Sequence, residues 1–214
     1  MTGLLKDRLR LYLVTDPQLC AEAGVMNTVQ RAVAGGVTMV QLRDKHAKTP
    51  ERIELAIALK NALQSSGVPL VINDDVVAAV ATDVDGAHIG QGDITPAEAR
   101  AMLGPGRILG LSCETAQTVR DADPTLVDYL GLGPVFGTAT KDDHAQPIGF
   151  DGLAGLVALS PLPTVAIGGL KHDHTNAVAA SGADGMAVVS AICGQPDPQA
   201  AAGAFHSFKP EHKA

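Results

Sequence analysis

The sequence predicts a single α/β domain over residues 1–214 that folds as a (β/α)8 TIM barrel, and three observations support this prediction. Short β-branched apolar runs alternate along the chain with Ala-rich stretches whose apolar residues follow helical spacing. Such regular alternation is typical of βαβ units and a parallel sheet. The chain has 214 residues and eight such apolar runs, which suit one small barrel. A doubly wound open sheet is the alternative that this pattern leaves open.

The expected strands are the eight apolar runs, and most of them lead into glycine or polar residues. In order along the chain they cover Leu11–Asp16, Thr38–Asp44, Pro69–Asp75, Gly86–Gly90, Ile108–Cys113, Tyr129–Val135, Thr164–Gly169 and Gly185–Ala191.

Helix signals lie between these strands. Glu51–Ser65 carries a helical stripe of apolar residues. Thr95, Pro96 and Glu98 are residue types typical of the N-cap, first and third positions of a helix. We expect the tail after Ala204, from about residue 205, to be frayed. Turns of small residues, typical of helix C-termini at the closed end of a barrel, are Ala34-Gly35-Gly36, Ser66-Gly67 and Ser181-Gly182-Ala183.

The composition restricts the possible partners. Hydrophobic residues make up 46% of the chain and aromatic residues 3%, with no Trp, so the core must be aliphatic. The formal net charge of −7 argues against nucleic acid as a partner. Small anionic substrates remain open, because a few cations gathered in one cleft reverse the local potential of an acidic protein.

Cysteine use and targeting signals indicate a compartment. Cys20, Cys113 and Cys193 are odd in number and far apart, which argues against a disulfide framework or a zinc site and favours reduced thiols in the core. No charged leader opens the chain, and no apolar run is long enough to cross a membrane. We therefore expect a cytoplasmic protein without a membrane partner, whose apolar barrel exterior leaves a homo-oligomer open.

The C-terminal ends of the strands carry the active site in barrels of this kind. The second expected strand ends Gln41-Leu42-Arg43-Asp44-Lys45, and alternation points Gln41, Arg43 and Lys45 to one side. An amide and two cations at this end suit a dianionic group. The alternative is a solvated strand end with a salt bridge to Asp44.

Acidic residues follow the next two strands. Asp74 and Asp75 come directly after a buried strand, and Asp93 lies on the adjacent loop. Paired carboxylates suit Mg²⁺, which takes one or two of them together with phosphate oxygens of a substrate. The alternative for each acidic residue is an N-cap of the following helix. His88 lies within a strand, and we expect a packed core histidine rather than a ligand.

The later loops offer groups that bind anions. Residues Gly137–Lys141 combine two Thr hydroxyls, backbone N–H groups and an ammonium, and Asp142–His144 extend this stretch to the length of a mobile flap. Gly168-Gly169 follow the seventh expected strand, and the eighth ends Val188–Ala191. The loops after these two strands commonly bind phosphate in such barrels.

Taken in order, these short motifs form a specific set. They are Gln41–Lys45, Asn73–Asp75, His88–Gln91 with Asp93, Gly131–Pro134, Thr138–Lys141 and Ile167–Gly169. The set resembles the thiamine-phosphate synthase family, and the resemblance runs from about Leu11 to Ile192.

The resemblance implies a transferase of thiamine biosynthesis. It implies that hydroxymethylpyrimidine diphosphate and a thiazole phosphate give thiamine phosphate and pyrophosphate by a dissociative substitution with Mg²⁺. Asp74 and Asp93 would be the metal ligands. By the same resemblance the pyrimidine is surrounded by Gln41 and Asn73. The diphosphate is contacted by Arg43, Lys45, Ser112 and Lys141, which carry the catalysis. The thiazole phosphate is bound by Thr138, Thr140, Gly169, Val189 and Ser190.

One position departs from the pattern. After Ser112 the family usually has a small residue, His and Thr, whereas this chain reads Cys113-Glu114-Thr115. A carboxylate at Glu114 would repel a diphosphate unless Lys141 or the metal compensates for it. The departure concerns the contacts that follow the fifth expected strand and not the fold.

Three other functions remain in competition. A thiazole tautomerase shares the barrel but tends to lack the paired acids and the Gly-Pro step, whereas Asp74, Asp93 and Gly133-Pro134 are present here. A phosphate-binding isomerase of another pathway needs an acid–base pair that the sequence does not reveal. A catalytically silent sensor of thiamine precursors has no need for the cations of the leaving-group site. Whether the thiazole carries a carboxylate, and which loop closes, is left open.

Overall fold

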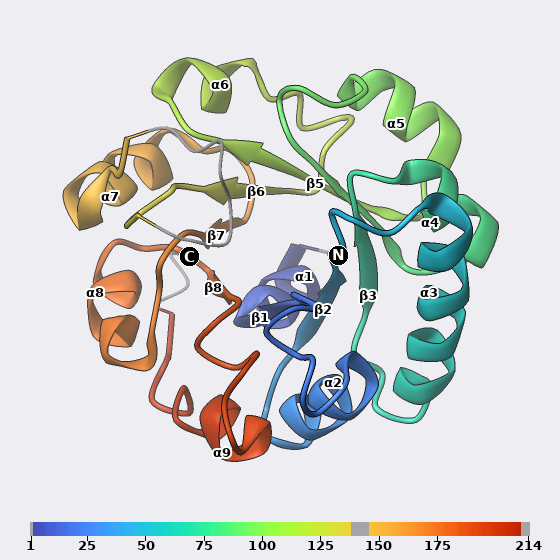
Figure 1. Ribbon diagram of the computed structural model, residues 1–214. Helices are drawn as coiled ribbons and strands as arrows, with labels where there is room; N and C mark the ends of the chain where they lie inside the picture. Colours follow the sequence, from blue (N-terminus) through green and yellow to red (C-terminus); the bar gives the residue numbers. More distant parts are fainter. Residues whose placement is uncertain (1, 138–145, 211–214) are drawn as a thin grey trace.

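Eight parallel strands close into one barrel (Figure 1), as the alternating pattern predicts. The computed structural model describes residues 2–137 and 146–210. Each strand pairs with the next and β8 pairs with β1, so the open-sheet alternative is wrong. The strands are β1 (Leu11–Val14), β2 (Met39–Leu42), β3 (Leu70–Asn73), β4 (Gly86–Ile89), β5 (Ile108–Cys113), β6 (Tyr129–Leu132), β7 (Thr164–Ala166) and β8 (Gly185–Val188).

The strands are mostly shorter than the apolar runs that predicted them. The paired part of β2 ends at Leu42 and that of β3 at Asn73, so the polar residues that follow lie in loops. Alternation along a strand therefore accounts for the direction of Gln41 but not for that of Arg43 or Lys45, which lie beyond the end of β2.

Helices form the outer layer around the barrel (Figure 1), and the residue types expected at their ends are present. Thr95 caps α5 by accepting from the backbone N–H of Glu98, whose carboxylate accepts from the backbone N–H of Thr95. The helices are α1 (Thr2–Leu9), α2 (Val25–Ala34), α3 (Thr49–Leu63), α4 (Val76–Thr82), α5 (Pro96–Leu103), α6 (Ala116–Asp121), α7 (Gly149–Leu159), η1 (His172–His174), α8 (Thr175–Ala180) and α9 (Pro198–Gly203).

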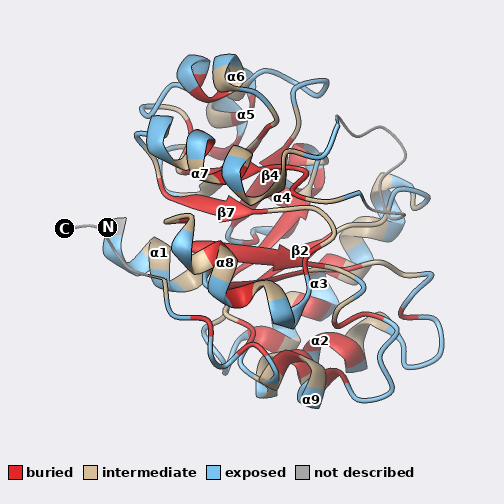
Figure 2. Ribbon diagram, turned by 90° about the vertical axis from the view of Figure 1, so that its left-hand side faces the viewer, coloured by how far each residue is buried: buried red, intermediate tan, exposed pale blue. Residues whose placement is uncertain are grey.

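Two apolar clusters hold these layers together, and Figure 2 shows the strands buried between them. The larger cluster fills the space between strands and helices and is dominated by aliphatic residues. The smaller one lies inside the barrel and includes Met39, Val71, Val165 and Ala187 together with two tyrosines. The aliphatic core that the composition predicts is therefore present, and inside the barrel two tyrosines are added to it.

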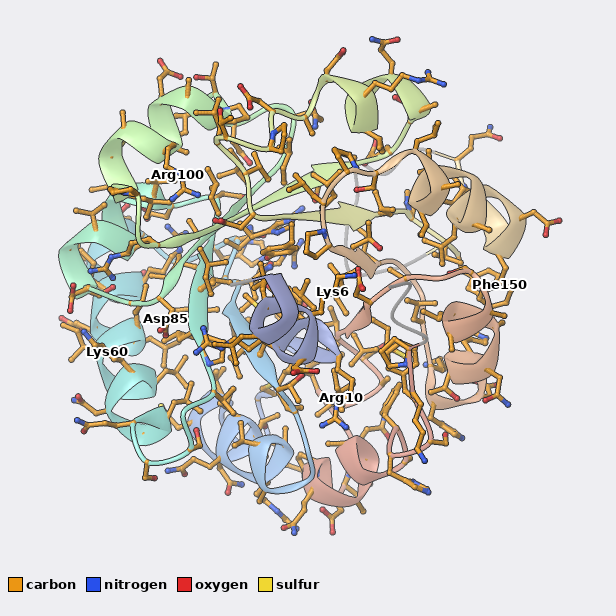
Figure 3. All side chains as sticks on the ribbon, turned by 180° about the vertical axis from the view of Figure 1, so that it is seen from behind. Lys6, Arg10, Lys60, Asp85, Arg100 and Phe150 are labelled. Carbon is orange, nitrogen blue, oxygen red and sulfur yellow. The ribbon has the colours of Figure 1, made fainter. Side chains whose placement is uncertain are left out.

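Helix α1 covers the end of the barrel at which the strands begin. Figure 3 views the molecule from this end and shows α1 across the centre, with Lys6 labelled. Leu9 is fully buried in the interior cluster, and the Lys6 ammonium lies 3.0 Å from a carboxylate oxygen of Asp184. Because α1 occupies this end, ligands reach the described barrel from the opposite one.

The chain after α9 remains packed against the body of the protein. Phe205 and Phe208 are both buried, so the expectation of fraying after Ala204 is wrong as far as Phe208. All three cysteines are buried thiols, as expected. Among the helices that the structure describes, none combines the length and the apolar character needed to cross a membrane.

Candidate active site

The C-terminal ends of the strands surround a cavity of about 520 Å³, and Figure 1 views the barrel from this end. Every strand, or the loop that follows it, contributes to the wall. Thr138, Thr140 and Lys141, with the expected flap Asp142–His144, lie outside the described residues. The other predicted site residues all line the cavity: Gln41, Arg43, Lys45, Asn73, Asp74, Asp93, Ser112, Gly169, Val189 and Ser190.

The loop after β2 brings two cations to the wall of this cavity. The backbone of Arg43 is held by Thr15, whose hydroxyl accepts from the Arg43 N–H at 2.9 Å and donates to the Arg43 carbonyl at 3.2 Å. Asp44 instead accepts from the backbone N–H groups of His46 and Ala47. Asp44 therefore stabilises the turn, while Arg43 and Lys45 face the cavity.

Asp74 and Asp93 form an acidic pair beside these cations. Asp74 has a left-handed backbone with φ of 62°, a conformation that Asp tolerates better than most residues. Burial, and then the negative charge of Asp93, raises the pKa of Asp74 to about 6, although Arg43 and Asn73 act in the opposite direction. Two carboxylates repel each other in a partly buried cavity, and a cation bound between them would offset this repulsion.

The neighbouring Asp75 has a different role. Its carboxylate accepts from the backbone N–H of Ala78 and so caps α4, and it pairs with Arg52 and accepts from the Thr49 hydroxyl at 2.9 Å. Burial alone would raise the pKa of Asp75, but these hydrogen bonds and the guanidinium together lower it below the ordinary value. The helix-cap alternative is thus correct for Asp75.

The cap alternative is wrong for Asp93, because the N-cap of α5 is Thr95. The Asp93 carboxylate accepts from the backbone N–H of Gly90 at 2.7 Å, which holds the loop after β4 against the cavity. No cluster of three or more His, Cys, Asp or Glu occurs among residues 2–137 and 146–210. A pair of carboxylates, with no third ligand of these types among the described residues, fits Mg²⁺ that completes its shell with phosphate oxygens and water.

The loops after β7 and β8 face the pair from another part of the wall. Gly168 and Gly169 have positive φ of 94° and 64°, and a Cβ at either one would collide with Pro134 or Phe136. The hydrogen bonds recorded among the described residues leave the backbone N–H groups of Gly169 and Ser190 unused. Unused N–H groups at adjacent loops form a site for a phosphate group.

The fifth strand presents Ser112 and Glu114 to the cavity. The backbone carbonyl of Ser112 accepts from Gln91 Nε2 at 2.7 Å, and Ser112 Oγ lies 2.9 Å from His88 Nε2. The sequence did not reveal this Ser–His pair. The other nitrogen of His88 faces the neutral hydroxyl of Tyr129 rather than a carboxylate, so the arrangement is not that of a nucleophilic triad.

Sequence reasoning missed the tyrosines of the barrel interior. The chain has only two tyrosines, Tyr12 on β1 and Tyr129 on β6, and their hydroxyls meet at 2.9 Å inside the barrel. Tyr12 also accepts from Gln41 Nε2 at 2.7 Å and lines the cavity. His88 is buried, as expected, but its ring also lines the cavity. A tyrosine in an otherwise aliphatic strand was the available signal.

Comparisons with known proteins show which sequences and which fold this chain is similar to. The sequence profile of the family described as thiamine monophosphate synthase matches residues 11–192. A thiamine-phosphate synthase of Psychrobacter sp. (strain PRwf-1) is 52% identical over 92% of this chain and 93% of its own. Another, from Xanthobacter autotrophicus, is 53% identical with the same coverage, 92% and 93%. The structure of a thiamine phosphate pyrophosphorylase from Pyrococcus furiosus superposes with a TM-score of 0.86 and 32% identity, covering 95% of this chain and 96% of that one.

Proposed function

The chain belongs to the thiamine monophosphate synthase family, and we propose that the cavity at the C-terminal end of its barrel is where thiamine phosphate is formed. The enzyme is a transferase with the thiamine-phosphate synthase function. Its two substrates are a pyrimidine that carries a methylene diphosphate and a thiazole that carries a phosphate. The C–O bond to the diphosphate breaks, the electron pair leaves with pyrophosphate, and a C–N bond forms to the thiazole nitrogen.

One observation carries this proposal: the same cavity holds a charged side and a phosphate-binding side. Arg43, Lys45 and the pair Asp74–Asp93 come from the loops after β2, β3 and β4. The N–H groups of Gly169 and Ser190, for which no bond is recorded among residues 2–137 and 146–210, come from the loops after β7 and β8. A diphosphate at the first side and a thiazole phosphate at the second would place the two reacting carbon and nitrogen atoms between them.

The charged side suits the leaving group of a dissociative substitution. Negative charge grows on the diphosphate as the C–O bond breaks, and Arg43 and Lys45 offset it. Ser112 contributes a hydroxyl to the same wall. Gln41 and Asn73 supply amides for the pyrimidine ring. The thiazole nitrogen is itself the nucleophile, so no protein nucleophile is needed.

Asp74 and Asp93 would hold Mg²⁺, which supplies charge neutralisation for the leaving diphosphate when bound. The raised pKa of Asp74 supports this assignment, because burial and the charge of Asp93 both disfavour its ionised form and a bound cation would favour it. Lys141, Thr138 and Thr140 are assigned to the diphosphate and thiazole-phosphate contacts by the resemblance alone, since they lie outside the described residues.

A product assay tests the proposal. Purified protein is incubated with both substrates, with and without Mg²⁺, and thiamine phosphate and pyrophosphate are measured. We expect equal amounts of both products, and only with metal. Absence of both products in the presence of Mg²⁺ would contradict the proposal and favour a binding protein. Isomerisation of the thiazole without coupling would favour a tautomerase.

A matched pair of variants separates a site residue from a structural one. Asp93→Ala should lower turnover at least about 100-fold while the melting temperature falls by only a few degrees, because one hydrogen bond to Gly90 is lost. The control is Asp173→Ala, an exposed aspartate on η1 outside the cavity, which should change neither quantity. Loss of stability with retained turnover in Asp93→Ala would make Asp93 a loop-stabilising residue.

The substrates are small and anionic, and the cytoplasm supplies Mg²⁺, so we assign the enzyme to that compartment. A homo-oligomer is compatible with the apolar side chains that the outer helices expose, among them Ile57, Val77 and Val80.

A further inference from the structure

A chain of five hydrogen-bonding side chains crosses the interior of the barrel at the floor of the cavity. Gln41 Nε2 donates to the Tyr12 hydroxyl at 2.7 Å, and that hydroxyl lies 2.9 Å from the hydroxyl of Tyr129. The Tyr129 hydroxyl lies 2.8 Å from His88 Nδ1, and His88 Nε2 lies 2.9 Å from Ser112 Oγ. The two ends, Gln41 and Ser112, both line the cavity, so the chain connects two groups that face the ligand.

Two glycines leave the space that this chain occupies. A Cβ at Gly110 of β5 would lie 2.2 Å from Tyr129 Cζ and 2.4 Å from His88 Nδ1. A Cβ at Gly131 of β6 would lie 3.2 Å from His88 Cε1. Any side chain at Gly110 would therefore displace the hydrogen bond between Tyr129 and His88. Gly110 and Gly131 thus leave room for these polar contacts within a mostly aliphatic interior.

The hydrogen bonds can run in one of two directions, because each hydroxyl, like a neutral imidazole, has a single polar hydrogen. In the first direction Gln41 donates to Tyr12, Tyr12 donates to Tyr129, and Tyr129 donates to His88 Nδ1. Nδ1 is then an acceptor, and neutral His88 carries its hydrogen on Nε2. Nε2 donates to Ser112 Oγ, which leaves the hydrogen of Ser112 for a group in the cavity.

The opposite direction is also self-consistent, provided that an oxygen of residue 41 faces Tyr12. Tyr12 would then donate to residue 41, and His88 would carry its hydrogen on Nδ1. The Ser112 hydroxyl would donate to His88 Nε2. Burial raises the pKa of both Tyr12 and Tyr129 above the ordinary value, so both remain neutral hydroxyls in either direction. The orientation of one amide thus selects between two states of a serine on the other side of the cavity.

We propose that this chain is a positioning device, in which the amide orientation of Gln41 fixes the Nε2–H tautomer of His88 and presents the Ser112 hydroxyl as a donor to the cavity. The inference rests on the proposed function for its use in catalysis. An amino group on the pyrimidine would donate to Gln41 Oε1 and so hold Nε2 against Tyr12. Ser112 would then donate to an oxygen of the leaving diphosphate, where charge develops.

The tautomer of His88 tests the proposal without an activity assay. Full-length protein labelled with ¹⁵N in histidine is studied by long-range ¹H–¹⁵N correlation, and the His88 signals are assigned by their loss in His88→Gln. We expect neutral Nε2–H imidazole in the wild type. The Nδ1–H form or an imidazolium in the wild type would overturn the proposal.

Reversing the direction of the hydrogen bonds between Gln41 and Ser112 is a sharper experiment. Gln41→Glu replaces the donor Nε2 by a carboxylate oxygen of the same size, so above neutral pH His88 should change to the Nδ1–H form. Adding Tyr12→Phe to Gln41→Glu should cancel that change, because the connection is cut. An unchanged tautomer in Gln41→Glu overturns the proposal. A change that persists without the Tyr12 hydroxyl also overturns it, since the effect would then act through the electric field.

Turnover tests the link to catalysis. Tyr129 is fully buried and does not line the cavity, so Tyr129→Phe removes its hydroxyl without touching a ligand. We expect kcat to fall about tenfold with KM changed less than about twofold, a loss the size of one hydrogen bond. In a Ser112→Ala background the same substitution should cause no further loss.

Thr164→Val is the matched control, because Thr164 Oγ1 is a buried hydroxyl for which no hydrogen-bond partner is recorded among the described residues. It should leave both kcat and the His88 tautomer unchanged. If Tyr129→Phe and Ser112→Ala lowered kcat independently, with multiplicative losses in the double variant, the hydrogen-bond chain would have only a structural role. Absence of coupling activity in the wild type, with the His88 results as expected, would overturn the proposed function and leave the positioning chain intact.

Discussion

Adjacent carboxylates on the loop after β3 serve two different regions of the molecule. Asp74 turns into the cavity, where burial and the negative charge of Asp93 raise its pKa to about 6. Asp75 turns into the layer between barrel and helices, where Arg52, Thr49 and the start of α4 lower its pKa. The structure is stabilised by ionised Asp75, whereas burial and repulsion from Asp93 disfavour ionised Asp74, and Arg43 and Asn73 offset this only in part.

Asp74→Asn should give the largest effect and should act on turnover alone. We expect thiamine phosphate formation to fall about 10³-fold, because one of the two assigned metal ligands is lost. The free energy of unfolding should stay the same or rise slightly, since repulsion with Asp93 is removed. Steady-state kinetics and urea unfolding on the same preparation check both halves. A stability loss above about 2 kcal/mol would show that Asp74 is structural.

Asp75→Asn should give the converse result. Side-chain exposures of 14% and 10% for Arg52 and Asp75 make this a largely buried ion pair, and its loss should cost about 3 kcal/mol of unfolding free energy. Turnover at a temperature where the variant is folded should stay within about twofold of the wild type. A fall in turnover comparable with that of Asp74→Asn would remove the distinction between the two residues.

The pH dependence of stability should separate them as well. Because the pKa of folded Asp75 is lowered, its contribution is fully present above its unfolded pKa of about 3.9 and disappears as the pH falls through the folded pKa. The difference in unfolding free energy between wild type and Asp75→Asn should therefore be constant from about pH 5 to 7 and should shrink below about pH 4. Urea unfolding across this range measures it, and a difference that grows with acidity would contradict the assigned ion pair.

Thr49→Val should produce the smallest of these effects. It removes the hydroxyl that donates to Asp75 at 2.9 Å, so the unfolding free energy should fall by about 1 kcal/mol. Turnover should not change, because Thr49 does not line the cavity. Any change in KM for either substrate would indicate that the region of Asp75 communicates with the site.

The sequence was sufficient for the barrel and for most of the described site, for a physical reason. Gln41, Asn73 and Ser112 lie at the last or next-to-last position of aliphatic strands and break their pattern, and the C-terminal ends of parallel strands meet at one face. The pattern could not assign Asp74 and Asp75 to different regions. That outcome depends on the left-handed backbone of Asp74, which alternation along a strand does not predict.

The hydrogen bonds of the positioning chain could not be predicted from the sequence. Tyr12 and Tyr129 are separated by 117 residues and meet only when the barrel closes, and His88 reaches Tyr129 only because Gly110 leaves space. Each residue alone is compatible with ordinary core packing. The hydrogen bonds become evident only from the three-dimensional register of β1, β4, β5 and β6.

Binding of Mn²⁺ in the presence of inorganic pyrophosphate tests the central claim most directly, because Mn²⁺ accepts the same oxygen ligands as Mg²⁺ and is visible by electron paramagnetic resonance. The wild type and Asp75→Asn should bind Mn²⁺ with equal affinity, and Asp74→Asn should bind at least about tenfold more weakly. Equal affinity in all three proteins, or a loss in Asp75→Asn alone, would contradict the assignment of the metal–diphosphate site to the cavity side of this loop.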